Sequence, residues 1–287
     1  MILKPINARL KLGLLIFLSI IVLCAVPFNV SAALYKEKEV LLKLNNGYIL
    51  YSVGTMPFID KNGRTLIPLR MIGDLMGSEV SWDDKNKSAT VRHDKTTIEF
   101  QIGRKYYQKN GVIIEMDTSA VISGDSTMIP VRYVAEAFEL ELNWDADNRI
   151  VELKHPDLLN TKAFSNFDEM ENRDNHFTGK LVPVKVEYIK GKTEDSNKLL
   201  VSVLNDSTTT VQAQHFHRNA IYYSDPDTVM GQGSFGHTAS SGMTGYNAEA
   251  IPGGSVFVDT IFLKSLEKAF NKPIKYLIFN YFNTIQS

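Results

Sequence analysis

The chain has 287 residues, with 31 basic side chains, 32 acidic side chains and a single cysteine. The formal net charge of −1 and the lack of a basic cluster argue against binding to nucleic acid, which requires grouped Lys and Arg to neutralise phosphates. The length is sufficient for two domains with separate cores, at roughly 100–150 residues each.

Residues 1–32 have the pattern of a secretory signal. A basic start is followed by the apolar stretch 12–26 and by the small-residue sequence Val-Ser-Ala that ends at Ala32. The apolar stretch is shorter than the roughly 20 residues that a membrane-spanning helix needs. We therefore expect export and cleavage between Ala32 and Ala33, with retention as an uncleaved anchor as the alternative.

The only cysteine, Cys24, lies inside this signal. A mature chain that starts at Ala33 contains no cysteine and has a net charge of −4, so disulfides and thiolate metal sites are excluded. Lipidation at Cys24 is a weaker alternative, because Leu23 stands where a lipoprotein signal has a small residue. A cysteine-free exported chain is typical of a bacterium with a single membrane.

An internal repeat follows the signal. Residues 65–93 reappear 62 positions later as residues 127–155, and nine of the twenty-nine aligned positions are identical. A repeat at a fixed period indicates a duplicated supersecondary unit. The identical pairs are Thr65/Thr127, Ile67/Ile129, Pro68/Pro130, Arg70/Arg132, Glu79/Glu141, Trp82/Trp144, Asp83/Asp145, Asn86/Asn148 and His93/His155.

Each copy predicts a short helix followed by a β-hairpin. An Ile-Pro pair opens each helix, because proline costs little at a helix start. The helix of copy one is expected to end in a left-handed cap at Gly77, whereas copy two has Glu139 there. Alternating apolar residues and Asp/Asn-rich turns then predict the hairpins, and Asn110-Gly111 predicts another hairpin between the copies.

These motifs resemble a known family. Thr-Leu-Ile-Pro-Leu-Arg at 65–70 and Val-Ser-Trp-Asp at 80–83 return as Met-Ile-Pro-Val-Arg at 128–132 and Leu-Asn-Trp-Asp at 142–145. In this order they are similar to the copper amine oxidase N-terminal-like stalk domain, over about residues 46–155. The resemblance implies an extracytoplasmic α+β module that carries neither copper nor the quinone cofactor. Glu139 departs from the glycine that the family usually has.

The duplicated arginines and tryptophans are the weak binding candidates of this half. Arg70 and Arg132 suit a ligand anion, but internal pairing with an acidic turn or a helix end is favoured. Trp82 and Trp144 suit stacking on a sugar ring, but their alternation favours positions in the core.

The second half predicts an all-β domain. Residues 156–177 are rich in Asp, Asn and Glu and read as a linker that contains a possible helix, and few contacts are expected to cross it. Alternating runs across 178–287 then favour a β-sandwich that is loosely similar to immunoglobulin-like modules. The expected architecture is a signal at 1–32, an α+β duplicated domain at 33–155, the linker, and the sandwich.

The chemical motifs of the second half are weak. A glycine-rich segment around residues 231–236 matches a dinucleotide pattern, but no helix can follow it, so a surface loop is expected. His215 and His217, two apart on a predicted strand, are weak metal candidates for which His237 would supply a third ligand. Exposed histidines without metal are favoured.

The sequence therefore predicts an exported, non-catalytic protein of the cell envelope or the medium, with no cofactor. The duplicated domain is expected to act as a scaffold and the sandwich as the binding module, with cell-wall polysaccharide or another envelope protein as partner. The alternative is a metal-binding protein or a metal-dependent enzyme centred on His215, His217 and His237.

Overall fold

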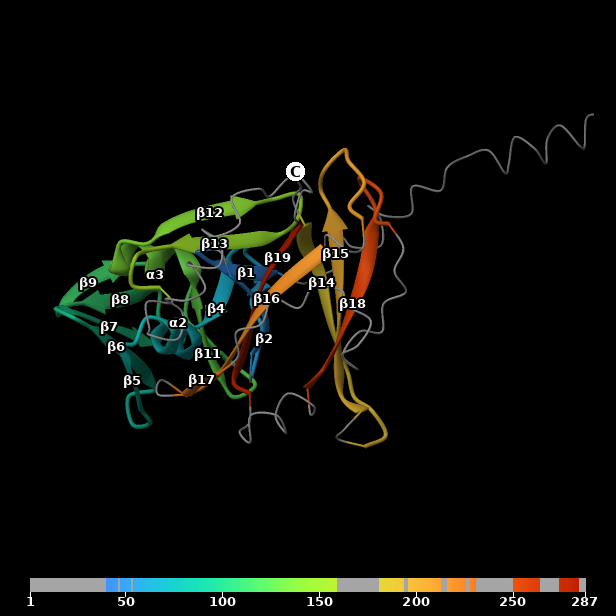
Figure 1. Ribbon diagram of the computed structural model, residues 1–287. Coiled ribbons are helices and arrows are strands. Elements are labelled where there is room, and N and C mark those ends of the chain that lie inside the picture. The colour runs from blue at the N-terminus through green and yellow to red at the C-terminus, as the bar shows by residue number, and fades with distance from the viewer. Residues whose placement is uncertain are drawn as a thin grey trace, which may run out of the picture. The chain divides into compact units, whose positions relative to one another are not determined.

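The computed structural model of the chain (Figure 1) describes nine ranges of residues. Within them the protein is mostly β-sheet and has two short helices. No described helix has the length and apolar character that crossing a membrane requires. The predicted signal with its Ala32–Ala33 cleavage site, most of the linker, the glycine-rich loop, His215 and His237 lie outside the described ranges. These ranges are 40–45, 47–52, 54–158, 181–193, 196–212, 216–225, 228–230, 250–263 and 274–283.

The two copies of the repeat have the same succession of elements, in which the helix and the hairpin were predicted and the strand before the helix was not. In each copy a strand leads through proline into a helix, and the helix is followed by a hairpin. Copy one consists of β4 (Thr65–Pro68), α2 (Leu69–Leu75), β5 (Glu79–Asp83) and β6 (Ser88–His93). Copy two consists of β11 (Ser126–Pro130), α3 (Val131–Phe138), β12 (Glu141–Asp145) and β13 (Ile150–Lys154).

The copies meet through antiparallel pairing of β4 with β11, in which Ile67 lies opposite Ile129. These strands belong to a four-stranded sheet of order β10-β11-β4-β3, with β3 at Phe58–Ile59 and β10 at Val121–Ser123. Equivalent positions therefore lie opposite each other at the centre of this sheet, and the two copies of the repeat form one structural unit.

Local chemistry explains the turns and caps. Asp83 Oδ1 accepts hydrogen bonds from the backbone amides of Lys85 and Asn86 at 2.8 and 3.0 Å, as expected for the acidic turn. Glu139 caps α3 in the left-handed region with φ of 59°, the conformation that Gly77 has after α2 with φ of 67°. The exit geometry is therefore the same in both copies, although Glu139 has a Cβ that disfavours it.

The hairpin predicted around Asn110-Gly111 is confirmed. It joins β8 (Tyr106–Lys109) to β9 (Val112–Glu115), and both turn residues have positive φ. With β7 (Thr96–Gln101) these strands extend the hairpin of copy one into a five-stranded sheet of order β5-β6-β7-β8-β9.

A seven-stranded sheet joins strands from both halves of the chain, in the order β12-β13-β1-β2-β19-β16-β17. Its junction is the antiparallel pairing of β2 with β19, in which Ile49 lies opposite Ile278 and Tyr48 opposite Phe279. The strands not yet bounded are β1 (Leu41–Leu44), β2 (Gly47–Ser52), β16 (Phe216–Asp225), β17 (Thr228–Met230) and β19 (Tyr276–Asn283).

A three-stranded sheet, β14-β15-β18, is made only from the second half. Its strands are β14 (Leu181–Ile189), β15 (Lys198–Asn205) and β18 (Val256–Phe262). The predicted strands of the second half are thus divided: three pair with one another and three extend a sheet that begins with β1 and β2.

The two hydrophobic cores use opposite faces of the seven-stranded sheet. Successive residues of a strand point to opposite faces, so Leu42 and Ile278 belong to the core that contains α2 and α3, and Leu41 and Leu277 belong to the core that contains the three-stranded sheet. One sheet therefore contributes side chains to both cores.

The expectation that few contacts cross the segment between residues 155 and 178 is wrong. β19 pairs along β2, and residues 38–287 form one compact unit. The physical reason is that β2 needs a partner on its far edge, and β19 supplies one whose alternating side chains are apolar on both faces.

Candidate functional site

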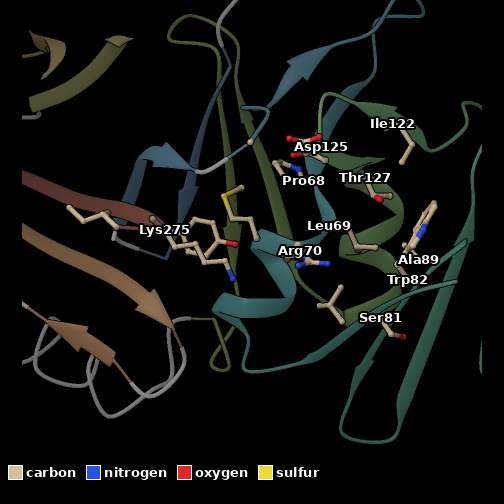
Figure 2. A pocket seen from close by; sticks show the side chains of 16 residues that line it. Pro68, Leu69, Arg70, Ser81, Trp82, Ala89, Ile122, Asp125, Thr127 and Lys275 are labelled. Carbon is tan, nitrogen blue, oxygen red and sulfur yellow. The ribbon is translucent and has the colours of Figure 1, made fainter. Parts of the chain in front are cut away.

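A pocket of about 640 Å³ opens where copy one, the β10–β11 hairpin and the start of β19 meet (Figure 2). This volume lies in the range of small-molecule sites. Its lining combines an indole, apolar groups, hydroxyl groups and charged groups: Gly54, Pro68, Leu69, Arg70, Met71, Val80, Ser81, Trp82, Ala89, Ile122, Asp125, Ser126, Thr127, Ile274, Lys275 and Tyr276. Two of the predicted binding candidates, Trp82 and Arg70, therefore lie in one pocket.

Trp82 is not a core residue, and the favoured interpretation is wrong for it. Its register is as expected, because it lies opposite Ala89 on β6 and so shares the face of that buried side chain. It stands near the end of β5, however, where the core gives way to the pocket, and 39% of its surface remains exposed. The alternation of residues along β5 predicted the face on which Trp82 lies, but it did not predict how far the hydrophobic core extends along that face.

Trp144 is likewise exposed, at 40%. It lies opposite the buried Val151, but β12 is an edge strand of the seven-stranded sheet in the described part of the chain. Trp144 does not line the pocket. The two equivalent indoles therefore have equal exposure in different surroundings.

The equivalent arginines also differ. Arg132 lies 3.8 Å from Asp117, which also accepts a 2.7 Å bond from Arg64 Nε. Partial burial would raise the pKa of Asp117, but the hydrogen bonds from Arg64 and Tyr133 outweigh burial and hold this pKa below its usual range. Arg132 thus pairs internally, but its partner Asp117 lies between β9 and β10 and belongs neither to an acidic turn of the hairpins nor to a helix end, the two partners that the sequence favoured.

Arg70 forms no ion pair within the described part of the chain. It is the second residue of α2, it is exposed, and it lines the pocket. Its guanidinium is therefore available to a ligand. A planar guanidinium donates two parallel hydrogen bonds to a carboxylate or phosphate.

The second half contributes one side of the pocket. Lys275 Nζ bonds Asp74 Oδ2 on α2, and Tyr276 Oη donates to the same oxygen at 2.7 Å. Figure 2 shows Arg70 between Trp82 and Lys275. Asp74 thus holds the start of β19 against α2 and sets this wall of the pocket.

Close contacts between residues 54–55 and Ser126 shape another part of the pocket. Thr55 donates its amide to Ser126 Oγ at 3.0 Å, and a Cβ on Gly54 would meet that oxygen at 2.4 Å. Gly54 also has φ of +102°, which a residue with a side chain rarely adopts. Gly54 is therefore required for the close approach of the two segments.

The histidines that the two copies of the repeat share were not expected to form a site. His93 and His155 both approach Asp157, with nitrogen-to-oxygen distances of 3.3 and 3.4 Å. The signal was their identity in the two copies. The predicted metal candidates cannot be compared with them, since His215 and His237 lie outside the described residues and only the backbone of His217, in β16, is described.

Residues 43–153 match the family model of the copper amine oxidase N-terminal domain. The matched part of the chain is therefore a stalk-like domain of a non-catalytic kind. It contains both copies of the repeat, Trp82 and Arg70, whereas Lys275 and Tyr276 lie beyond it. A comparison with curated proteins gives no match.

Proposed function

We propose that the protein is an exported, non-catalytic protein of the cell envelope or the medium that binds an anionic polysaccharide in the Trp82 pocket. The observation that carries the proposal is an indole, 39% exposed, that shares a pocket of about 640 Å³ with a guanidinium. The stalk-like domain provides the scaffold. The sequence predicted that the second half would bind the ligand. The proposed site instead lies mainly in the duplicated domain, and the second half contributes only the start of β19.

The chemistry of the pocket favours a sugar polymer over an apolar ligand. An indole face packs against the C–H groups of a pyranose ring, while Ser81, Thr127 and Asp125 provide hydroxyl and carboxylate partners for sugar hydroxyls. Arg70 selects a carboxylate or phosphate on the polymer. No cofactor is required for this role.

The test uses the two tryptophans of the chain. The variant Trp144→Phe leaves Trp82 as the only indole, so intrinsic fluorescence then reports on the pocket. Titration with alginate, a polymer of uronic acids, should shift or quench this emission, and neutral dextran should have a smaller effect. Unchanged emission at saturating alginate and on isolated cell wall would contradict the proposal.

Matched variants locate the binding site. Trp82→Ala and Arg70→Gln should each reduce binding at least about tenfold, because they remove the stacking surface and the charged donor. Trp144→Ala and Arg132→Gln change the equivalent residues of copy two outside the pocket and should leave binding unchanged. Equal losses from both copies would mean that the pocket is not the site.

Export is tested separately. The cleavage motif that ends at Ala32 implies a secreted chain that begins at Ala33. N-terminal sequencing of protein recovered from the medium or the envelope should find Ala33, and Met1 on secreted material would contradict this part of the proposal.

A further inference from the structure

The repeat places two histidines around one carboxylate. His93 is the last residue of β6, and His155 follows directly after β13. β6 and β13 belong to different sheets, yet both imidazoles lie within 3.4 Å of Asp157 Oδ2. The convergence of equivalent residues is thus a product of the tertiary fold.

Asp94 lies beside His93 and Asp157 and offers a third ligand group. The potential ligand atoms of His93, Asp94 and Asp157 all lie within 4.8 Å of one another. Imidazole nitrogen and carboxylate oxygen are ligands that Zn²⁺ takes in proteins. We propose that His93, Asp94 and Asp157 bind a divalent cation with the ligand preference of zinc and leave a coordination position open to water.

The distances agree with tetrahedral coordination. Zinc bonds of 2.0–2.2 Å place neighbouring ligand atoms roughly 3.3–3.6 Å apart at a tetrahedral centre. His93 Nε2 and Asp157 Oδ2 are already 3.3 Å apart. Asp94 is exposed in the turn between β6 and β7, and its carboxylate lies within 4.8 Å of the other two ligand atoms.

Hydrogen bonds orient the ligands. His93 Nδ1 lies 3.0 Å from Ser78 Oγ, which fixes the ring and directs Nε2 towards Asp157. Such an outer partner is a usual feature of a metal-bound histidine. His155 Nδ1 accepts the backbone amide of Asp157 at 3.1 Å and thereby positions the carboxylate.

The same bond leaves Asp157 Oδ2 facing an acceptor. The lone pair of His155 Nδ1 accepts the amide hydrogen of Asp157, so in this geometry Nδ1 is not the donor to Asp157 Oδ2, which lies 3.4 Å away. A bound cation neutralises this carboxylate and links the end of β6 in copy one to the segment after β13 in copy two.

The experiment is calorimetric titration of the purified chain with Zn²⁺. One equivalent should bind, and the melting temperature should rise by about 2–4 °C at saturation, because a ligand that binds only the folded state stabilises it. Co²⁺ should give the visible absorption of a four-coordinate site. Absence of stoichiometric binding would overturn the proposal.

Substitutions distinguish this site from others. Asp94→Asn, Asp157→Asn and His93→Gln should each weaken zinc binding at least about tenfold. Asp147→Asn changes an exposed aspartate in the turn between β12 and β13 of copy two and should leave zinc binding unchanged, as should the triple variant His215→Ala/His217→Ala/His237→Ala.

Asp94→Asn is the decisive variant, because Asp94 is exposed and asparagine also tolerates the left-handed φ of 49° at this position. The fold should therefore be retained. Undiminished binding in Asp94→Asn, or loss only in the triple histidine variant, would overturn the proposal. Neither result affects the polysaccharide proposal, which rests on different residues.

Discussion

Replacement of Ile278 by alanine tests whether β19 supports the stalk-like part of the chain. Ile278 is 0% exposed, lies opposite Ile49 on β2 and belongs to the core that contains α2 and α3. It lies 125 residues beyond the end of the family match at residue 153. An effect on that part therefore reveals coupling through the shared sheet.

The magnitude follows from the burial of Ile278. Removing the side chain of a fully buried isoleucine costs about 2–5 kcal/mol, because transfer energy is lost and a cavity remains. With a urea dependence of about 3 kcal/mol per molar for a unit of this size, a loss of about 3 kcal/mol lowers the unfolding midpoint by about 1 M.

Tryptophan fluorescence is the assay, because Trp82 and Trp144 both lie within the matched residues 43–153. Leu277→Ala removes a neighbouring side chain that is also 0% exposed but faces the other core, and it should lower the same midpoint by a similar amount. Val258→Ala, at a residue 47% exposed, should change stability by less than about 0.5 kcal/mol.

An unchanged midpoint in Ile278→Ala would refute the reasoning. The stalk-like part would then unfold independently of β19, and the seven-stranded sheet would not couple the two halves.

Fragment 33–155 should fail to fold cooperatively on its own, because it lacks β19 and exposes one face of β1 and β2; a sharp thermal transition by circular dichroism would contradict this. Glu139→Gly should raise the free energy of unfolding by about 0.5–1 kcal/mol, because glycine adopts the left-handed cap without strain. Gly77→Ala at the equivalent position should lower the free energy of unfolding by about 1 kcal/mol. Melting temperatures that moved in the opposite directions would contradict strain at these caps. Hydrogen bonds from Arg64 and Tyr133 hold the pKa of Asp117 low, so Asp117 stabilises the fold above its unfolded pKa of about 3.9, and this stability is lost as the pH falls through the folded pKa. Asp117→Asn should therefore make the fall of stability at acidic pH less steep. An unchanged acid dependence would exclude this contribution.

Sequence alone determined the features that depend on neighbouring residues. The Ile-Pro pairs placed both helices, the acidic turns placed the hairpins, and Asn110-Gly111 placed the tight turn between β8 and β9. Each of these features rests on backbone torsions and hydrogen bonds within a few residues, so a local pattern is sufficient to predict it.

Tertiary structure decided which surfaces these elements cover. The period of two placed Trp82 on the correct face of β5, but its exposure depends on where the neighbouring layer ends. The pairing of β19 with β2, the approach of Lys275 to Asp74, and the approach of His93 to Asp157 join residues between 64 and more than 200 positions apart. The alternation of apolar and polar residues specifies which face of a strand is buried but not which distant strand pairs with it. Several strands of the chain have the same alternation, so the partner is determined by the packing of both hydrophobic cores together.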